Sequence, residues 1–436
     1  MEPVPAFHPD WFHISACGLV LCTTVGIALG RPRVKGWGRL GPAHAAVVAV
    51  LAVLLTGSAT PWELAWAYQN LIRPFAAIAG IMVMTACVQR SGLLEAFAGR
   101  FLNRAGLRAA GVFTLSFSFA AVLSSVLNND AMILLLTPLV LAMAQEGWPG
   151  QPKIHRIHAY AVFAAIGVAP VVIANPINLL VADQAGIGFN RYWLHMAPAA
   201  VLCWAVTWAI LAALFRRELQ TVRNGNGPAA SAGGRPTDKP DRLTTQQRQA
   251  ALVLGGIVVA YPIVSVFHEW AVAAVSVVGA LILLRVVRAP TRTLLVEEVE
   301  WGILLFMLGA FAIGLGLQNA GVVDWLAGVY RDGGLPALAA ISATGSAALN
   351  NHPMTILNLL TLQSNSTPDL HYLVVLAGGD LGPRLLPSGS LAGLLWLAAC
   401  RRRGVRIPLK WFVITGAITL IPALLVAVGL LVLLNL

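Results

Sequence analysis

Long apolar stretches separated by short polar ones run along the whole chain. Segments such as AHAAVVAVLAVLLTG (43–57) and VITGAITLIPALLVAVGLLVLL (413–434) are apolar around every face of a helix. Helices of this kind are typical of membrane spans. We count about ten segments long enough to cross a bilayer. They lie near 12–29, 41–59, 75–89, 159–183, 195–215, 249–267, 270–287, 301–318, 372–399 and 411–433.

Two further apolar stretches, 109–145 and 336–362, are each interrupted by a polar tip. This pattern predicts re-entrant helical hairpins, whose tips must be buried in protein or line a wet cavity because lipid cannot satisfy polar backbone groups. Each hairpin precedes a span rich in Pro and Gly, 168–186 and 377–396. Pro removes a backbone donor and Gly loosens the helix, so both of these spans are predicted to be discontinuous. The predicted fold class is an all-α polytopic membrane protein.

Composition supports this interpretation and excludes several classes of protein. Of the 436 residues, 58% are hydrophobic and 11% are charged, and the mean hydropathy is +0.77. Soluble domains carry about 25% charged residues, so a soluble enzyme, a secreted disulfide scaffold and a disordered chain are excluded. The five cysteines show no metal-site spacing, and the sequence indicates no cofactor and no metal.

The net charge of +11 reflects topology and does not indicate a nucleic-acid partner. Most of the 29 Lys and Arg residues gather in alternate loops if both termini lie outside and both hairpins return to their own side. Basic loops face the cytoplasm, which predicts a multi-pass protein of the prokaryotic plasma (inner) membrane with both termini outside. The lipid bilayer is therefore an expected partner.

The two halves of the chain resemble each other. CVQRSGLLEAFAG (87–99) is similar to GLQNAGVVDWLAG (316–328), and SVLNNDAM (125–132) to AALNNHPM (347–354). We predict a first repeat over 1–215 with hairpin 109–145, a polar cytoplasmic linker over 216–248, and a second repeat over 249–436 with hairpin 336–362. An odd number of spans separates corresponding elements, so the second repeat is predicted to be inverted. Inverted repeats with paired hairpins are typical of secondary transporters, whose substrate site lies near the midplane.

The hairpin tips and broken spans carry the candidate substrate ligands. Asparagine caps helix ends and also offers donors and acceptors to a substrate. The predicted substrate-binding residues are Asn128, Asn129, Asn350, Asn351, Asn175, Asn178, Ser388 and Ser390. A purely structural role, in which the asparagines only satisfy broken backbone, is the alternative.

Three ionisable residues inside predicted membrane segments are candidates for proton coupling. Asp130 lies at the first tip, His352 occupies the matching position at the second tip, and Asp380 lies in the ninth span. Ionisable groups within a membrane are costly and usually functional. Asp380 and Arg384 are four residues apart, so an ion pair between them is an alternative role for both.

The chain resembles the arsenical pump membrane protein (ArsB) family of the ion transporter superfamily. The resemblance runs from about Pro74 to the C-terminus. It rests on LNNDAMILLLTPLV (127–140), ANPINLLVADQ (174–184), LGAFAIGLGLQNAG (308–321), ALNNHPMTIL (348–357) and GGDLGPRLLPSGSLAGLLWL (378–397). It implies a scaffold domain with a mobile transport domain, and export of trivalent arsenic and antimony hydroxides by exchange with protons. A cytoplasmic arsenical pump ATPase is an implied candidate partner. The alanine after Asp130, where a glycine is common, and His352, where an apolar residue is more usual, depart from the family pattern.

These observations predict secondary active efflux of arsenite and antimonite in exchange for protons, with elevator-type alternating access. Arsenite is an uncharged trihydroxide at neutral pH, and hydrogen-bonding amides suit it better than a cationic clamp. A sodium/proton antiporter of the same superfamily is the nearest alternative. A membrane-embedded enzyme is disfavoured because HExxH, GxSxG and His-rich metal motifs are missing. A passive channel is disfavoured by the inverted hairpins.

Overall fold

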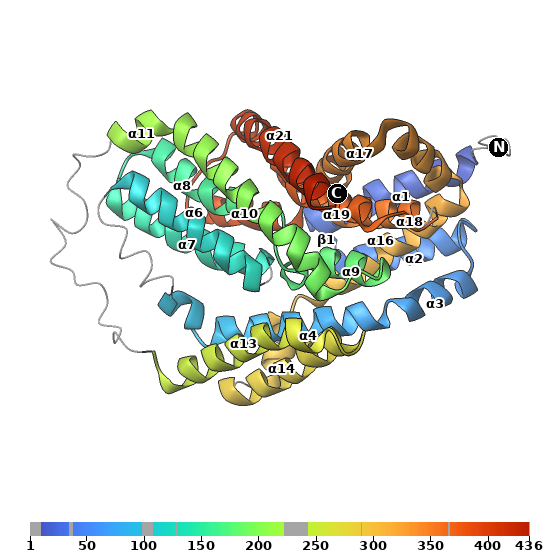
Figure 1. Cartoon of the computed structure of the whole chain (residues 1–436), viewed down its shortest axis with the longest axis horizontal. Helices are drawn as coiled ribbons and strands as arrows, with labels where there is room; N and C mark the ends of the chain where they lie inside the picture. Colours follow the sequence, from blue (N-terminus) through green and yellow to red (C-terminus); the bar gives the residue numbers. More distant parts are fainter. Residues whose placement is uncertain are drawn as a thin grey trace.

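The computed structural model describes residues 10–34, 38–97, 108–127, 129–221, 243–288, 290–364 and 367–435. Helices make up nearly all of the regular structure in these ranges (Figure 1). The exception is a ladder of two-residue strands, β1 (Arg33–Val34) and β2 (Gly38–Arg39), which pair antiparallel in the loop after the first helix. The predicted all-α polytopic fold is therefore confirmed.

Most helices of the first half coincide with predicted spans or hairpins, and α3 and α11 lie outside them. The helices of this half are α1 (Trp11–Gly30), α2 (Pro42–Leu55), α3 (Pro61–Asn70), α4 (Ile72–Arg90), α6 (Ala109–Val126), α7 (Asn129–Gly147), α8 (Pro152–Ala165), η1 (Val172–Ala174), α9 (Pro176–Gln184), α10 (Phe189–Leu214) and α11 (Arg216–Thr221).

The second half has a comparable order of elements. It contains α13 (Thr245–Val264), α14 (Ala271–Val287), α15 (Thr291–Thr293), η3 (Leu294–Glu298), α16 (Trp301–Asn319), α17 (Val322–Leu349), α18 (Asn351–Gln363), α19 (Asp369–Leu381), η4 (Gly382–Arg384), η5 (Pro387–Gly389), α20 (Leu391–Arg402) and α21 (Leu409–Leu434). Helix α17 is interrupted at Gly334, whose φ of 61° and ψ of −160° are not helical.

Seven helices in the described ranges are long and apolar enough to cross a membrane. They are α1, α4, α7, α10, α13, α16 and α21, and three shorter apolar helices, α2, α6 and α14, accompany them. The two spans predicted to be discontinuous are broken, the first between α8 and α9 and the second between α19 and α20. The direction in which each helix crosses the membrane stays a prediction.

At each predicted hairpin tip, two helices that follow one another along the chain are in contact, and their re-entry from one side of the membrane stays a prediction. Helices α6 and α7 meet at the first tip, and the second part of α17 meets α18 at Asn350. In both halves of the chain a long helix is followed by a hairpin, a broken helix and another long helix. The predicted boundaries of the repeats, and the inversion of the second, stay predictions. Asn128 and most of the predicted linker lie outside the described residues.

Helices α3, α4, α13 and α14 lie together along the lower side of the molecule in Figure 1. Helix α4 packs on α14 and α16 packs on α2, while α10 packs on α21. Close packing of α4 and α14 depends on Gly80, since a Cβ there would lie 2.6 Å from the backbone carbon of Ser276. Gly309 likewise allows α16 to pack closely on α2, because a Cβ there would lie 2.7 Å from the Cα of Ala46.

The hydropathy pattern does not predict helix α3, although its sequence carries a clear start signal. Thr60 caps the helix by accepting a hydrogen bond from the backbone N–H of Glu63 at 3.2 Å, and Pro61 follows directly. Glu63 Oε2 accepts from the backbone N–H of Thr60 at 2.7 Å, which completes a capping box.

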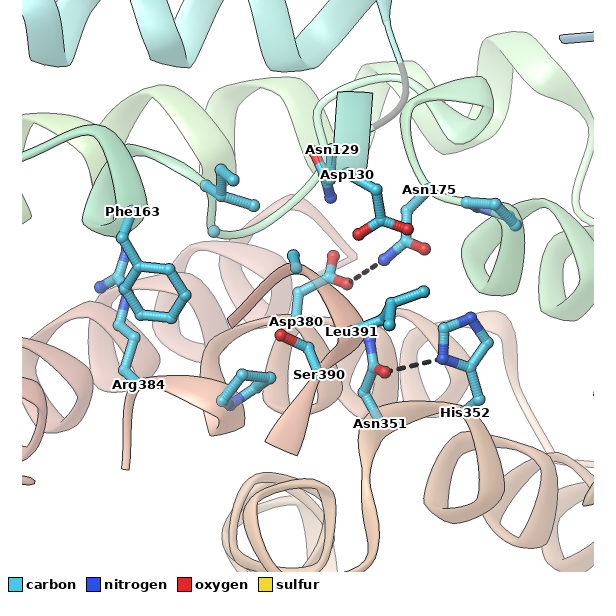
Figure 2. A pocket seen from close by; sticks show the side chains of 15 residues that line it. Asn129, Asp130, Phe163, Asn175, Asn351, His352, Asp380, Arg384, Ser390 and Leu391 are labelled. Atoms are coloured by element: carbon cyan, nitrogen blue, oxygen red, sulfur yellow. Dashed lines mark hydrogen bonds between the residues drawn. The ribbon is translucent and has the colours of Figure 1, made fainter. Parts of the chain in front are cut away.

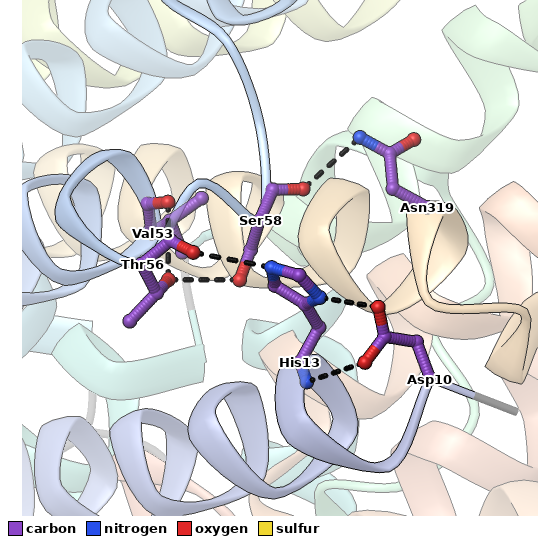
Figure 3. A network of polar contacts seen from close by, with 6 residues as sticks. All are labelled: Asp10, His13, Val53, Thr56, Ser58 and Asn319. Atoms are coloured by element: carbon purple, nitrogen blue, oxygen red, sulfur yellow. Dashed lines mark hydrogen bonds and ion pairs between the residues drawn. The ribbon is translucent and has the colours of Figure 1, made fainter.

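A polar network ties the ends of α1, α2 and α16 together (Figure 3). The carboxylate of Asp10 pairs with His13 Nδ1 at 2.6 Å, and His13 Nε2 lies 3.1 Å from the carbonyl oxygen of Thr56. Thr56 and Ser58 join their hydroxyls at 2.8 Å, and Asn319 Nδ2 donates to the carbonyl of Ser58 at 3.0 Å. This network joins the ends of helices that lie far apart in the sequence.

Candidate functional site

Four helices begin around one small polar cavity: α7, α9, α18 and α20 (Figure 2). Its volume is about 40 Å³. The residues that line it are Asn129, Asp130, Phe163, Ile166, Gly167, Asn175, Pro176, Asn351, His352, Asp380, Pro383, Arg384, Ser390, Leu391 and Ala392. The cavity therefore lies where both hairpins and both broken spans meet.

Side-chain caps explain why three of these helices begin at the cavity. Asn175 Oδ1 accepts from the backbone N–H of Ile177 at 3.3 Å, and Ser390 Oγ accepts from that of Gly393 at 3.0 Å. Asn350 Oδ1 accepts from the backbone N–H of residue 352 at 3.3 Å, with its own backbone at a φ of 79°. Helix N-termini carry partial positive charge. Four of them directed at one cavity favour oxygen-rich ligands and carboxylates.

Two carboxyl groups lie among these partially positive helix N-termini. Asp130 stands in the first turn of α7, and Asp380 in the last turn of α19. Asp380 Oδ1 accepts from Asn175 Nδ2 at 2.8 Å, and Oδ2 accepts from Asn178 Nδ2 at 2.8 Å and from the backbone N–H of Ala169 at 3.1 Å. Asp380 is thus held by the segment that connects α8 to α9 and by the start of α9.

His352 and Asn351 form the wall contributed by the second hairpin. Both side chains are buried, and His352 Nδ1 lies 2.8 Å from Asn351 Oδ1. His352 Nε2 is buried, and none of the residues that the structure describes provides it with a hydrogen-bond partner. The ring of Phe306 packs edge-on against the imidazole, with the ring centroids 6.2 Å apart.

The alternative that Asp380 and Arg384 form an ion pair is wrong. Within the described part of the chain, Arg384 Nη2 donates to the carbonyl of Ala164 at 2.7 Å and Nη1 to Thr207 Oγ1 at 3.0 Å, and no ion pair joins it to Asp380. The helix ends at residue 381, so the spacing of four residues does not bring the two side chains together as it would within one helix.

Asp130 also lines a second cavity, of about 90 Å³. Its other walls come from α4, α7, α16 and α20 and from the segment that leads into α16, which contributes Glu298 and Glu300. Glu298 pairs with Arg90 at the end of α4, and Glu300 Oε2 lies 3.8 Å from Arg31 Nη2. Asp130 therefore stands between the polar cavity and an acidic one.

The structure brings most of the predicted site residues together. Asn129, Asp130, Asn175, Asn351, His352, Asp380 and Ser390 all line the polar cavity. Asn178 does not line the cavity. Its Nδ2 donates to Asp380 Oδ2 at 2.8 Å and to Tyr192 Oη at 3.0 Å. Asn350 Nδ2 donates to the carbonyl of Ser388 at 3.2 Å, and neither residue lines the cavity. Asn128 lies outside the described residues.

Sequence reasoning does not identify Arg384 and Phe163 as lining residues. The sequence marks Arg384 only as a partner for Asp380, and the available signal is that a lone arginine stands within a predicted span. Phe163 carries no distinguishing signal in an apolar helix. Among the residues that the structure describes, no three His, Cys, Asp or Glu side chains gather closely enough to hold a metal ion.

Comparison with known proteins places the chain among membrane transporters. The family described as "Citrate transporter" (CitMHS) matches residues 35–378. The arsenical pump membrane protein of Escherichia coli strain K12 is 28% identical over 430 residues, covering 94% of this chain and 97% of that protein. The arsenical pump membrane protein of Yersinia enterocolitica is 27% identical over 435 residues, with the same coverage of both chains.

The fold is also similar to that of a solved transporter. The crystal structure of the YdaH transporter of Alcanivorax borkumensis superposes with a TM-score of 0.54 and 15% sequence identity, covering 98% of both chains. At this level of identity the likeness concerns the fold.

Proposed function

The chain belongs to the citrate-transporter family of the ion transporter superfamily, and we propose that it exports trivalent metalloid hydroxides, arsenite and antimonite, in exchange for protons. It is a multi-pass membrane transporter. The proposal about its substrate rests on the chemistry of the polar cavity together with the arsenical pump proteins to which the chain is similar over almost its whole length.

The observation that carries the proposal is the lining of the polar cavity. Asn129, Asn175 and Asn351 offer amide donors and acceptors, and Ser390 offers a hydroxyl. A neutral trihydroxide needs both donors and acceptors, and it brings no charge that must be compensated. The N-termini of four helices add further polarity directed at the oxygen atoms of such a molecule.

The same lining disfavours citrate, although the family carries that name. Asp130 and Asp380 would repel a tricarboxylate at close range. The guanidinium of Arg384 is turned to Ala164 and Thr207 and so does not provide a clamp for a carboxylate. A cavity of about 40 Å³ has room for only a few water molecules, which suits a small substrate.

Proton exchange is assigned to Asp130, with His352 as a second candidate and Asp380 as a third. Asp130 lines both cavities, so a proton can reach it from the acidic cavity while substrate occupies the polar one. Movement of the two hairpins and broken spans as one body against the remaining helices would give elevator-type alternating access.

A sodium/proton antiporter is the second candidate function. Two carboxyl groups and several amide oxygens around one cavity are also a plausible set of cation ligands.

The proposal for the exporter has three further parts. We propose that the protein lies in the bacterial inner membrane with both termini outside the cell, and that it associates with a cytoplasmic arsenical pump ATPase.

The test is transport into proteoliposomes that contain the purified chain under an imposed pH gradient. Trivalent arsenic or antimony should accumulate, and the accumulation should collapse when the gradient is dissipated. Sodium should have no effect, and citrate should neither compete nor be transported. Movement of sodium without metalloid would instead favour the antiporter, and substrate-specific citrate flux would refute the exporter.

A further inference from the structure

Arg384 is a buried arginine in the middle of the molecule. Its side chain is 1% exposed, and none of the ion pairs in the described part of the chain includes it. Its Nε is buried and has no hydrogen-bond partner within the described ranges of the chain. A guanidinium is always charged, so burial at this position requires compensation from the surrounding structure.

Part of this compensation comes from the end of helix α8. Arg384 Nη2 donates at 2.7 Å to the carbonyl of Ala164, one residue before the last residue of α8. The last carbonyls of a helix lack partners within the helix and carry partial negative charge. Gly167 leaves room for the guanidinium, because a Cβ there would lie 2.9 Å from Nη2.

Asp380 holds the other side of the same break. It accepts from the backbone N–H of Ala169 and from two side chains, Asn175 and Asn178, at the start of α9. The partial positive charge at the N-terminus of α9 favours this carboxylate. Opposite charges from one short segment, 380–384, therefore bind the two ends of the unwound segment between α8 and α9 without touching each other.

We propose that Arg384 and Asp380 act as a charge-compensating clasp that holds the two broken spans together as one rigid unit. The two charges cancel and stay fixed through the transport cycle, which leaves Asp130 as the group that gains and loses the proton. Arg384 and Asp380 are thus positioning residues. Exchange of one proton at Asp130 for one uncharged substrate moves one net charge across the membrane per cycle. This last statement rests on the proposed function.

Other ionisable side chains surround the clasp. Tyr160 of α8 and Cys203 of α10 stand close to Arg384, and Tyr192 of α10 stands close to Asp380. Asp130 and His352 face the clasp across the polar cavity. Tyrosine and cysteine remain neutral near pH 7, so Asp130 and His352 are the groups able to change charge beside the clasp.

A double-mutant cycle tests the clasp without any assumption about the substrate. The quantity measured is the thermal unfolding midpoint of each purified variant in detergent. Arg384→Gln and Asp380→Asn each leave one buried charge uncompensated and should each lower the unfolding midpoint by at least about 5 °C. The double variant Asp380→Asn/Arg384→Gln should recover more than half of that loss. Arg191→Gln, which breaks an exposed ion pair with Asp369, serves as the control and should change the midpoint little. Additive losses in the double variant would refute the clasp.

Transport measurements on the same variants test which side chain carries the exchanged proton. If the wild type moves metalloid, each single variant should lose at least about tenfold in rate, and the double variant should regain part of that rate with the wild-type pH midpoint. Arg384→Lys keeps the charge but loses the paired donors, and its transport rate should lie between those of the single variants and that of the double variant. A double variant that transports without coupling to protons would make Asp380 the proton carrier and overturn the proposal. A wild type that moves no metalloid would refute the proposed function alone, since the stability cycle still decides the clasp.

Discussion

Asn175 donates its side-chain amide to the carboxylate of Asp380 at 2.8 Å, across 205 residues of sequence. The same asparagine caps α9 by accepting from the backbone N–H of Ile177. One side chain therefore starts a half-helix at the polar cavity and connects it to the other broken span. The candidate site consists of such shared contacts, in which a residue that shapes the backbone also presents a group to the cavity.

Asn175→Ala is expected to reduce metalloid transport at least about tenfold, because it removes a hydrogen bond to a carboxylate, worth about 1.5–3 kcal/mol, as well as a helix cap. The measurement is the initial rate of uptake into proteoliposomes. Asn190→Ala is the matched control, since Asn190 donates to the carbonyl of Pro262 away from the cavity. Equal rates for both variants would contradict a role for Asn175 at the site.

Asp130→Asn is expected to abolish uptake driven by a pH gradient while the protein remains folded. The amide keeps the size of the carboxyl group but cannot exchange a proton in the physiological range. Downhill counterflow of radiolabelled or isotopically enriched metalloid should persist, which separates loss of coupling from loss of binding. Full proton-driven uptake by the variant would exclude Asp130 as the coupling group.

The acidic cavity should influence how fast protons reach Asp130. Glu298→Gln and Glu300→Gln in combination are expected to slow exchange several-fold at high pH and to have less effect at low pH, where protons are abundant. The readout is the rate of uptake across a pH series, with Glu146→Gln as the control because that residue lies outside both cavities. A uniform loss at every pH would indicate that the two glutamates matter only for structure.

Gly416→Ala is expected to destabilise the protein strongly. A Cβ at this position in α21 would lie 1.7 Å from the carbonyl oxygen of Arg384, and the backbone there cannot move without disturbing the clasp. Overpacking of this kind typically costs about 1–3 kcal/mol. Gly429→Ala in the same helix has no atom within 4 Å of the new methyl group and should leave the unfolding midpoint unchanged or slightly raised.

The capping box of α3 predicts a small dependence of stability on pH. Hydrogen bonds from the backbone and side chain of Thr60 lower the pKa of Glu63 below its ordinary value. The contribution is therefore complete above the ordinary glutamate pKa and is lost as the pH falls through the lowered one. Comparison of unfolding midpoints for the wild type and Glu63→Gln should give curves that converge at acidic pH. A constant difference would exclude this contribution.

Much of the fold and a large share of the site follow from local sequence. Spans such as 301–318 and 411–433 are apolar along their whole length, and a bilayer leaves such a segment few alternatives to a helix. The breaks in the fourth and ninth spans follow from Pro170, Pro176, Pro383 and Pro387, because proline removes the donors that a continuous helix needs. The tips carry asparagine and ionisable residues in otherwise apolar surroundings, and this contrast in polarity is enough to mark them as candidate site residues.

The tertiary structure alone decided which polar groups share the cavity and which only support it. The local sequence predicts four substrate ligands in the broken spans, Asn175, Asn178, Ser388 and Ser390. Of these four, only Asn175 and Ser390 line the cavity. The local sequence also allows an ion pair between Asp380 and Arg384, whereas the structure satisfies each by a different part of the region between α8 and α9. The physical reason is that hydropathy and backbone propensity act over a few neighbouring residues. Hydrogen bonds and compensation of buried charge depend on groups that lie hundreds of residues apart in the chain and meet only when the helices pack.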